Sequence, residues 1–239
     1  MPEPVSLVVV AHPDDVELTC GGTIVRWVRD GESSVLLVAT DGARGGKYQG
    51  TNAEEVVAER RQEQREAASI LGFEDVEFLG FPDGELQDDE TLRETLVRHI
   101  RRVQPSKVVT IDPLTVIFRN SYVNHRDHRI LGMSLLDALY PQASNAGYFP
   151  AQLDSGLTLH KVPEVLLAQS DRPNHWVDVS DSLEIRFRAL RAHASQMKLW
   201  PDRGEAVIHQ QRELAALLGL EHGVRYAEEF RRVVVNPLA

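Results

Sequence analysis

The sequence predicts an α/β fold of the Rossmann-like type, in which a mostly parallel sheet carries helices on both faces. Short runs of apolar, mostly β-branched residues alternate with longer segments whose apolar residues recur every three or four positions. The short runs are apolar at nearly every position, as in strands that crossover helices bury on both faces. No repeat, low-complexity tract or linker divides the 239 residues, so we expect one domain over residues 1–239.

The first half of the chain carries the regular alternation. Its short apolar runs predict four buried strands at Val5–Val10, Val35–Thr40, Val76–Leu79 and Lys107–Ile111. Between them, the helical periodicity predicts helices at Gly22–Asp30, Glu54–Leu71 and Asp89–Val103. Gly72 is a typical helix stop, and Asp89 or Thr91 is a suitable N-cap.

The second half is less regular. We expect a helix from about His128 to Leu139, followed by the polar stretch Pro141–Gly156. Further elements are expected as two strands, two helices and a last edge strand: Val165–Ala168, Trp176–Val179, Leu183–Gln196, Glu205–Leu218 and Phe230–Val235.

Composition narrows the classes of partner and compartment. The formal net charge of -10 disfavours a nucleic-acid backbone or an anionic membrane surface as partner. No run approaches the roughly 20 apolar residues that span a bilayer, and the N-terminal apolar run lacks a preceding basic region, so it predicts a core strand and not a signal peptide. Cys20 is the only cysteine, which excludes an internal disulfide. We therefore expect a reducing, cytoplasmic location.

Three polar groups of residues follow predicted strands. His12-Pro13-Asp14-Asp15 comes directly after the first strand, Thr40–Gly46 ends the second, and His125–His128 follows the fourth after a loop. Ligands of open α/β sheets collect at the carboxyl ends of the strands, so all three groups are expected to converge on one cleft.

The residue types in these groups are typical of a catalytic zinc site. Such a site takes about three protein ligands and keeps one position open for water. His12 and Asp15 are three residues apart at a strand-to-helix turn, and His128 supplies a third donor; two imidazoles with one carboxylate suit zinc better than magnesium. Asp14 is then free to act as a base toward the attacking water, and His125 to stabilise or protonate the reacting centre. Asp127 is expected to orient one of the imidazoles.

Each motif has an ordinary structural interpretation when it stands alone. A lone HxxH at a helix start is more often a surface or capping feature, and an HPDD turn is often a strand exit with carboxylates near a helix N-terminus. The occurrence of both after predicted parallel strands favours the metal site.

The stretch AHPDDVELTCGGTI at Ala11–Ile24 resembles the signature of the PIG-L/LmbE-like zinc-dependent de-N-acetylases. The resemblance continues in order through TDG, FLGFPDGEL, HRDH, AHASQ and YAEEF. It implies a Rossmann-like zinc amidase in which zinc is bound by His12, Asp15 and His128, with Asp14 as general base. It also implies that His125 stabilises the transition state, with Asp127 as its orienting partner.

The resemblance also implies residues near the substrate. Arg60 matches a position that reaches into the substrate pocket of relatives, and His193 and Gln196 match a C-terminal motif near the site. Arg44 and Lys47 add positive potential to the loop Asp41–Lys47. The sequence departs from the family pattern at two positions. Arg126 replaces the family's usual proline, which changes the turn before His128 but removes no ligand. Ala43 replaces a common acid in the second loop, which bears on substrate identity.

We therefore expect a Zn2+-dependent hydrolase that deacetylates a small N-acetyl amino sugar of the N-acetylglucosamine type. A homo-oligomer is expected because relatives often form one. One alternative is an amidase that cleaves a larger thiol conjugate or natural product. The other is a non-catalytic sugar- or nucleotide-binding domain, which Asp14 argues against because a pure binder needs no base. Gly21-Gly22 alone is also not the GxGxxG of a dinucleotide site.

Overall fold

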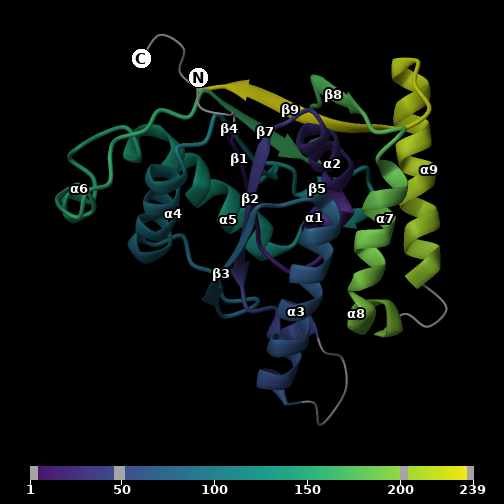
Figure 1. Ribbon diagram of the computed structural model, residues 1–239, viewed down its shortest axis with the longest axis horizontal. Coiled ribbons are helices and arrows are strands. Elements are labelled where there is room, and N and C mark those ends of the chain that lie inside the picture. The colour runs from purple at the N-terminus through teal and green to yellow at the C-terminus, as the bar shows by residue number, and fades with distance from the viewer. Residues whose placement is uncertain (1–4, 46–51, 200–203, 236–239) are drawn as a thin grey trace.

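The computed structural model describes residues 5–45, 52–199 and 204–235. Its centre is a seven-stranded sheet in the order β3-β2-β1-β4-β7-β9-β8 (Figure 1). Neighbours from β3 to β7 pair in parallel, whereas β9 is antiparallel to both β7 and β8, so the predicted mostly parallel sheet is confirmed. The strands are β1 Val5–Val10, β2 Ser33–Thr40, β3 Asp75–Phe81, β4 Lys107–Ile111, β7 Glu164–Ala168, β8 His175–Asp178 and β9 Ala227–Val234.

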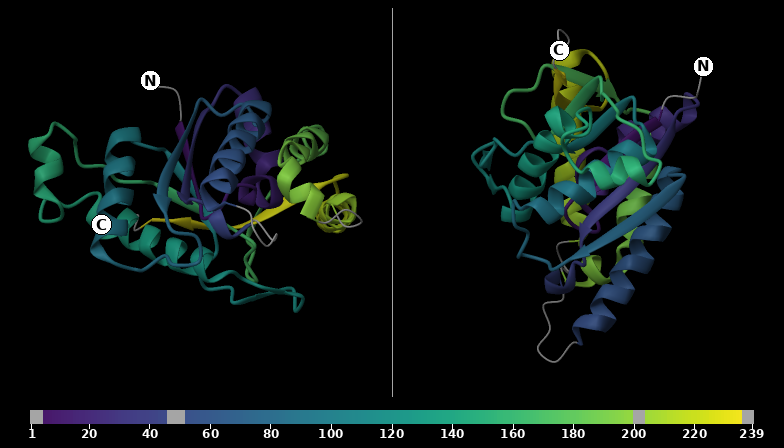
Figure 2. Two further views of the ribbon diagram at one scale, coloured as in Figure 1. Left: turned by 90° about the horizontal axis from the view of Figure 1, so that it is seen from below. Right: turned by 90° about the vertical axis from the view of Figure 1, so that its left-hand side faces the viewer.

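Helices cover both faces of this sheet, as Figure 2 shows from two further directions. In Figure 1, α7, α8 and α9 lie together on one side of the molecule, and α4, α5 and α6 on the other. No helix in the described ranges combines the length and apolarity needed to span a bilayer. The helices are α1 Asp15–Thr19, α2 Gly21–Arg29, α3 Ala53–Leu71, α4 Glu90–Val103, α5 Arg126–Asp137, α6 Pro150–Asp154, α7 Leu183–Ala192, α8 Ala194–Leu199 and α9 Gly204–His222.

The central strand β1 divides two hydrophobic cores. Val8 and Val10 pack into the core that includes residues of α2, α3 and α7, whereas Leu7 and Val9 belong to the core that includes residues of α4 and α5. Successive side chains of a strand point to opposite faces, so a strand covered on both faces must be apolar at every position. This explains the apolar run Leu7–Val10 within β1.

Two second-half predictions were wrong in detail. The predicted helix Leu183–Gln196 is two helices, because His193 leaves helical geometry at φ -75° and ψ 60° and its ring is fully buried. The predicted edge strand Phe230–Val235 belongs to β9, which lies between β7 and β8. Phe230 is fully buried there, as an interior strand requires.

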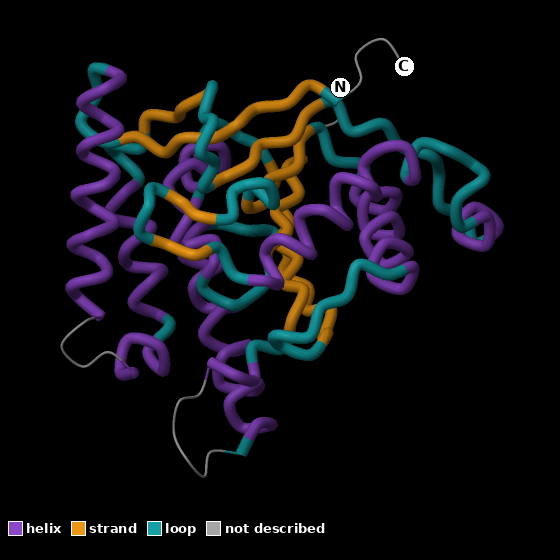
Figure 3. Tube along the Cα trace, turned by 180° about the vertical axis from the view of Figure 1, so that it is seen from behind, coloured by secondary structure: helices purple, strands orange, loops and turns teal. Residues whose placement is uncertain are grey.

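The loop between β4 and α5 contains a short hairpin that the sequence did not predict. Its strands, β5 Ile117–Phe118 and β6 Tyr122–Val123, pair antiparallel and form a separate two-stranded sheet. Figure 3 shows them in front of the central sheet when the molecule is seen from behind. The hairpin leads directly into the segment that carries His125 and His128.

Candidate active site

Three donor atoms converge at the carboxyl end of β1. His12 Nδ1 lies 3.2 Å from His128 Nε2 and 3.5 Å from an Asp15 carboxylate oxygen, and the other Asp15 oxygen lies 3.2 Å from His128 Nε2. Asp15 and His128 are buried. The structure thus brings together the three residues that the sequence singled out as metal ligands.

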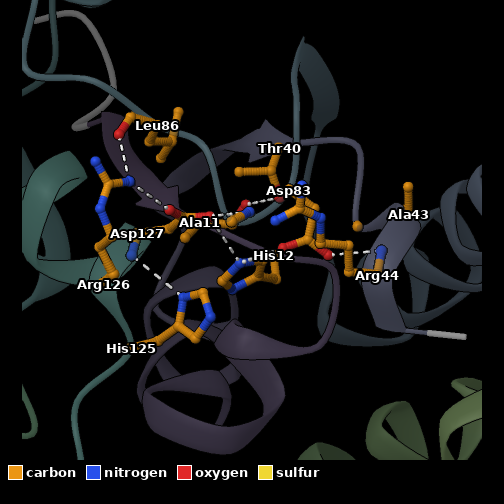
Figure 4. A network of polar contacts seen from close by, with 12 residues as sticks. Ala11, His12, Thr40, Ala43, Arg44, Asp83, Leu86, His125, Arg126 and Asp127 are labelled. Carbon is orange, nitrogen blue, oxygen red and sulfur yellow. Dashed lines mark hydrogen bonds and ion pairs between the residues drawn. The ribbon is translucent and has the colours of Figure 1, made fainter. Parts of the chain in front are cut away.

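Two further carboxylates stand behind the His12 ring (Figure 4). Its Nε2 lies 3.2 Å from Asp83 and 3.4 Å from Asp127. Burial lowers the pKa of His12, but the hydrogen bonds that its ring donates to Asp127, Asp15 and Asp83 outweigh burial and raise that pKa to about 12. The group therefore concentrates negative charge around one imidazole in a buried place, which favours the binding of a divalent cation there. His12, Asp83 and Asp127 also form a group whose ligand atoms all lie within 4.8 Å of one another.

The ring of His128 is held from behind. Its Nδ1 lies 3.0 Å from the Asn124 side-chain oxygen, so Nε2 is turned toward His12 and Asp15. The Asn124 amide in turn donates to the carbonyls of Asp112 and Thr115, at 3.2 Å and 2.9 Å. Such partners fix the tautomer and orientation of a ligating imidazole. No sequence pattern had pointed to Asn124.

Asp14 lies beside this group in an unusual backbone conformation. Its φ of 94° and ψ of -15° place a non-glycine residue in the left-handed region. Its backbone N–H donates to Gln64 Oε1 at 2.9 Å, and its carboxylate accepts from Arg60 Nη2 at 3.2 Å. Burial raises the pKa of Asp14, and the positive charge of Arg60 opposes that rise. Residues held in such conformations cluster at functional sites.

Arg60 braces the loop that carries Asp14. Besides that carboxylate, its guanidinium donates to the carbonyl of Pro13 at 2.6 Å and to that of Gly42 at 2.9 Å. A Cβ at Gly45 would overlap the guanidinium, so a larger residue there would displace Arg60 from these contacts. The terminal nitrogens are therefore engaged inside the protein, and contact between Arg60 and a substrate stays a prediction.

An ion pair with Glu63 on the same helix would be the ordinary structural role of Arg60, but Glu63 binds Ser195 instead. The Glu63 carboxylate accepts from the backbone N–H and the hydroxyl of Ser195, at 2.6 Å and 2.7 Å. This ties α3 to the start of α8.

His125 is the N-cap of α5, and its ring lies against those of His12 and His128, with centroid distances of 4.7 Å and 5.5 Å. Its Nδ1 accepts the backbone N–H of Asp127 at 3.2 Å. Burial and the two neighbouring histidines lower the pKa of His125, so its neutral form is favoured. With Nδ1 used as an acceptor, the neutral ring carries its proton on Nε2, which is a hydrogen-bond donor.

The Asp127 carboxylate lies beside His12 and not beside His125, the partner that the resemblance implied. It accepts from the Gly84 N–H at 2.7 Å and faces His12, so His125 receives the backbone N–H of Asp127 and not its carboxylate. The reason is local geometry. Asp127 lies in the first turn of α5 and its side chain points away from His125 (Figure 4).

His193 is also placed differently from the expectation. Its ring is fully buried, with Nε2 3.3 Å from the Glu17 carboxylate, so it does not line a surface that a substrate reaches. Glu17 accepts from Gln64 Nε2 at 3.1 Å, and Gln64 holds the Asp14 N–H. His193 therefore closes a buried polar chain that ends at Asp14. Gln196 donates to Ser195 Oγ at 3.1 Å.

Arg44 lies in a short 3-10 turn at Ala43–Gly45. Its side chain is exposed and pairs with Glu85, while its backbone N–H donates to Asp83 at 2.9 Å (Figure 4). Substrate contact by Arg44 stays a prediction. Lys47, the other cation expected in this loop, lies outside the described residues.

A cavity of about 600 Å³ opens beside Asp15 and His128. Its walls come from α1, the β5–β6 hairpin, the end of β7 and α9. Its size lies within the range of small-molecule sites.

The sequence did not predict the roles of Asp83, Glu17, Gln64 and Asn124 near this site. Of these four, only Asp83 could have been found from the sequence, because it follows β3 at the same edge of the sheet as the other groups. Glu17, Gln64 and Asn124 are buried by contacts that form only on folding.

The chain is similar to known deacetylases over most of its length. Diacetylchitobiose deacetylase of Thermococcus kodakarensis is 33% identical over 227 residues, which cover 95% of this chain and 82% of the relative. The 1D-myo-inositol 2-acetamido-2-deoxy-alpha-D-glucopyranoside deacetylase of Mycobacterium sp. (strain JLS) is 29% identical over 259 residues, covering 91% and 82%. The solved structure of N,N'-diacetylchitobiose deacetylase from Pyrococcus horikoshii superposes with a TM-score of 0.87 at 28% identity, covering 100% of this chain and 88% of that one.

The family assignment rests on a match that spans more than half of the chain. The sequence model of the PIG-L family, described as GlcNAc-PI de-N-acetylase, matches residues 7–139. That range contains all three of the converging donors and Asp14. The chain therefore belongs to the PIG-L family.

Proposed function

We propose that this chain is a zinc-dependent hydrolase that removes the acetyl group from the nitrogen of an N-acetylglucosamine-type amino sugar or a related small molecule. The observation that carries the proposal is the convergence of His12, Asp15 and His128 within 3.5 Å, with Asp14 beside them. The named activities of the diacetylchitobiose and inositol-glycoside deacetylases support the substrate class.

The donor set supports zinc in particular. Two imidazole nitrogens and one carboxylate give three protein ligands of the kind found in catalytic zinc sites. A zinc ion bound there supplies Lewis acidity and a water of lowered pKa. Asp83 and Asp127 behind His12, and Asn124 behind His128, hold the two rings in place for that role.

Asp14 acts as the general base. Its carboxylate takes a proton from the attacking water as the oxygen forms a bond to the amide carbonyl carbon. The raised pKa of Asp14 makes the carboxylate a stronger base than an ordinary aspartate and its protonated form easier to populate. Gln64 and Arg60 hold the side chain in this position.

His125 stabilises the negative charge that develops on the carbonyl oxygen, because its neutral ring presents an Nε2–H donor. When the tetrahedral centre collapses, the C–N bond breaks and the amine nitrogen takes a proton from protonated Asp14 or from His125. The products are acetate and the free amine.

Two rival functions stay open to test. An amidase for a larger natural product or thiol conjugate would use the same residues, and the cavity of about 600 Å³ accepts more than an acetyl group. A non-catalytic sugar-binding domain would not need Asp14. A cytoplasmic location, a small-molecule partner and a homo-oligomer stay predictions.

The direct experiment measures amine release from N,N'-diacetylchitobiose, N-acetylglucosamine and a panel of other N-acylated metabolites. Protein as purified, chelator-treated protein and chelator-treated protein restored with Zn2+ are compared, with Asp14→Asn as a matched variant of similar side-chain size. We expect zinc-restored turnover on an N-acetyl amino sugar and little in Asp14→Asn. If only other N-acyl compounds release an amine, the proposed amino-sugar substrate is wrong. If no compound releases an amine, the proposed enzymatic function is wrong.

A further inference from the structure

Two side chains of α3 hold a single peptide group, the one that joins Pro13 to Asp14. Arg60 Nη2 donates to the Pro13 carbonyl at 2.6 Å. Gln64 Oε1 accepts the N–H of Asp14 at 2.9 Å. Residues four apart lie on the same face of a helix, so Arg60 and Gln64 reach the two ends of this peptide together. The plane of the peptide is therefore set from α3, and with it the backbone of Asp14, whose φ is 94°.

The Gln64 amide can hold Asp14 in only one of its two orientations. Its Nε2 donates to Glu17 Oε1 at 3.1 Å, and the Gln64 side chain is fully buried. The Asp14 N–H can only donate, and an ionised carboxylate can only accept. A flipped amide would place two donors against each other at Asp14 and two acceptors against each other at Glu17. Glu17 therefore fixes the orientation in which Gln64 accepts from Asp14.

His193 holds the other side of Glu17. Its Nε2 lies 3.3 Å from Glu17 Oε2, the oxygen that Gln64 does not use, and both residues are fully buried. Burial lowers the pKa of His193, but nearby carboxylates, Glu17 foremost, outweigh burial and raise that pKa. The cationic ring then supplies the counter-charge that a buried carboxylate needs.

We propose that Glu17 and Gln64 are positioning residues for the general base. Glu17 fixes the Gln64 amide, and Gln64 holds the Asp14 N–H so that the Asp14 carboxylate stays beside the three converging donors. His193 supports the pair by neutralising Glu17. None of these three side chains lines the cavity, so they act on the reaction only through Asp14. The inference rests on the proposed function, in which Asp14 is the base.

Steady-state kinetics with zinc restored test the role of Gln64. Gln64→Met has a similar volume but holds neither Asp14 nor Glu17. Its kcat should fall about 10- to 100-fold, because a reacting group misplaced by about 1 Å can cost about 100-fold in rate. KM and zinc content should stay within about twofold of the parent values. Gln62→Met, at an exposed glutamine of the same helix, is the matched control and should keep the parent kcat.

A double-mutant cycle tests whether Glu17 acts through Gln64. Glu17→Gln no longer presents a pure acceptor, so the Gln64 amide can flip and kcat should fall about threefold or more. In the Gln64→Met background the same substitution should change kcat by less than about twofold, because the amide that Glu17 orients is gone. An equal fall in both backgrounds, or no fall in either, would overturn the role of Glu17. If Gln64→Met keeps the parent kcat, or loses zinc or changes only in KM, Gln64 does not position the base.

Hydrogen exchange separates this inference from the proposed function. The Asp14 amide, followed by NMR in metal-free protein, should exchange at least about tenfold faster in Gln64→Met than in the parent or in Gln62→Met. An unchanged exchange rate would overturn the inference whatever the turnover. Thermal melts check that each variant is folded, and Gln64→Asn, whose shorter side chain cannot reach both partners, replaces Gln64→Met if that variant is unfolded.

The two failures have different signatures. If the parent protein shows no turnover, or if Asp14→Asn keeps it, the proposed function fails, and faster exchange in Gln64→Met still shows that Gln64 holds the Asp14 backbone. If Asp14→Asn loses turnover and Gln64→Met does not, the base is correctly assigned and only this inference fails.

Discussion

Asp14 has a left-handed backbone conformation, which is strained for a residue other than glycine. Substitutions at Asp14 test whether this strain lowers the stability of the protein. The residue has φ 94° and ψ -15°, a conformation that glycine adopts without penalty. We compare Asp14→Gly with Asp14→Ala, because both remove the carboxylate and its ion pair with Arg60 at 3.2 Å. The lost ion pair is then common to both variants and cancels in the comparison.

The expected difference follows from the backbone alone. Alanine in the left-handed region costs about 1–2 kcal/mol, whereas glycine costs about 0.5–1 kcal/mol through its larger unfolded-state entropy. Asp14→Gly should therefore have a free energy of unfolding about 1 kcal/mol larger than Asp14→Ala. Both should lose turnover, and Asp14→Asn should lower it by on the order of 10²–10⁴.

Urea unfolding of metal-free protein measures the stability difference, because bound metal would add its own contribution. Steady-state amine release with zinc restored measures turnover. Equal or lower stability of the glycine variant would show that the turn is unstrained. Near-normal turnover of Asp14→Asn would place the general base elsewhere.

The remaining predictions concern His125 and Arg60. His125→Ala should raise the activation free energy by about 2–4 kcal/mol, so kcat falls while ground-state binding changes little. If steady-state kinetics instead show a change confined to KM, His125 positions the substrate. Arg60→Met removes a positive charge that lowers the pKa of Asp14, so that pKa rises and the acid limb of the kcat/KM profile should move to higher pH. If the acid limb of the profile does not move and substrate affinity falls, the predicted contact between Arg60 and the substrate is favoured. If neither the acid limb nor kcat/KM changes and the melting temperature falls slightly, Arg60 is purely structural.

Much of the sheet could be predicted from sequence because its signal is local. Strands β1 and β4 have the predicted bounds, since their apolar runs must be buried on both faces. The position of β9 between β7 and β8 could not be predicted, because strand order depends on pairing between distant segments. The hairpin of two-residue strands is too short to produce a periodic pattern.

The same contrast holds at the site. His12 and Asp15 directly follow a strand, and His128 follows another strand of the same sheet edge, so their convergence could be foreseen. The burial of His193 could not, because it depends on Glu17, which is distant in the sequence. Nor could the engagement of Arg60 by the carbonyls of Pro13 and Gly42, since backbone acceptors leave no mark in the sequence.

The metal content of purified protein tests the central claim most directly. Elemental analysis without added metal should find one zinc-class ion per chain in the parent protein and in Asp14→Asn, because Asp14 is proposed as base and not as ligand. Asp15→Ala and His128→Ala should each lose most of it, since each removes one of the three converging donors. Full metal occupancy in both of these variants would contradict the proposed ligand set.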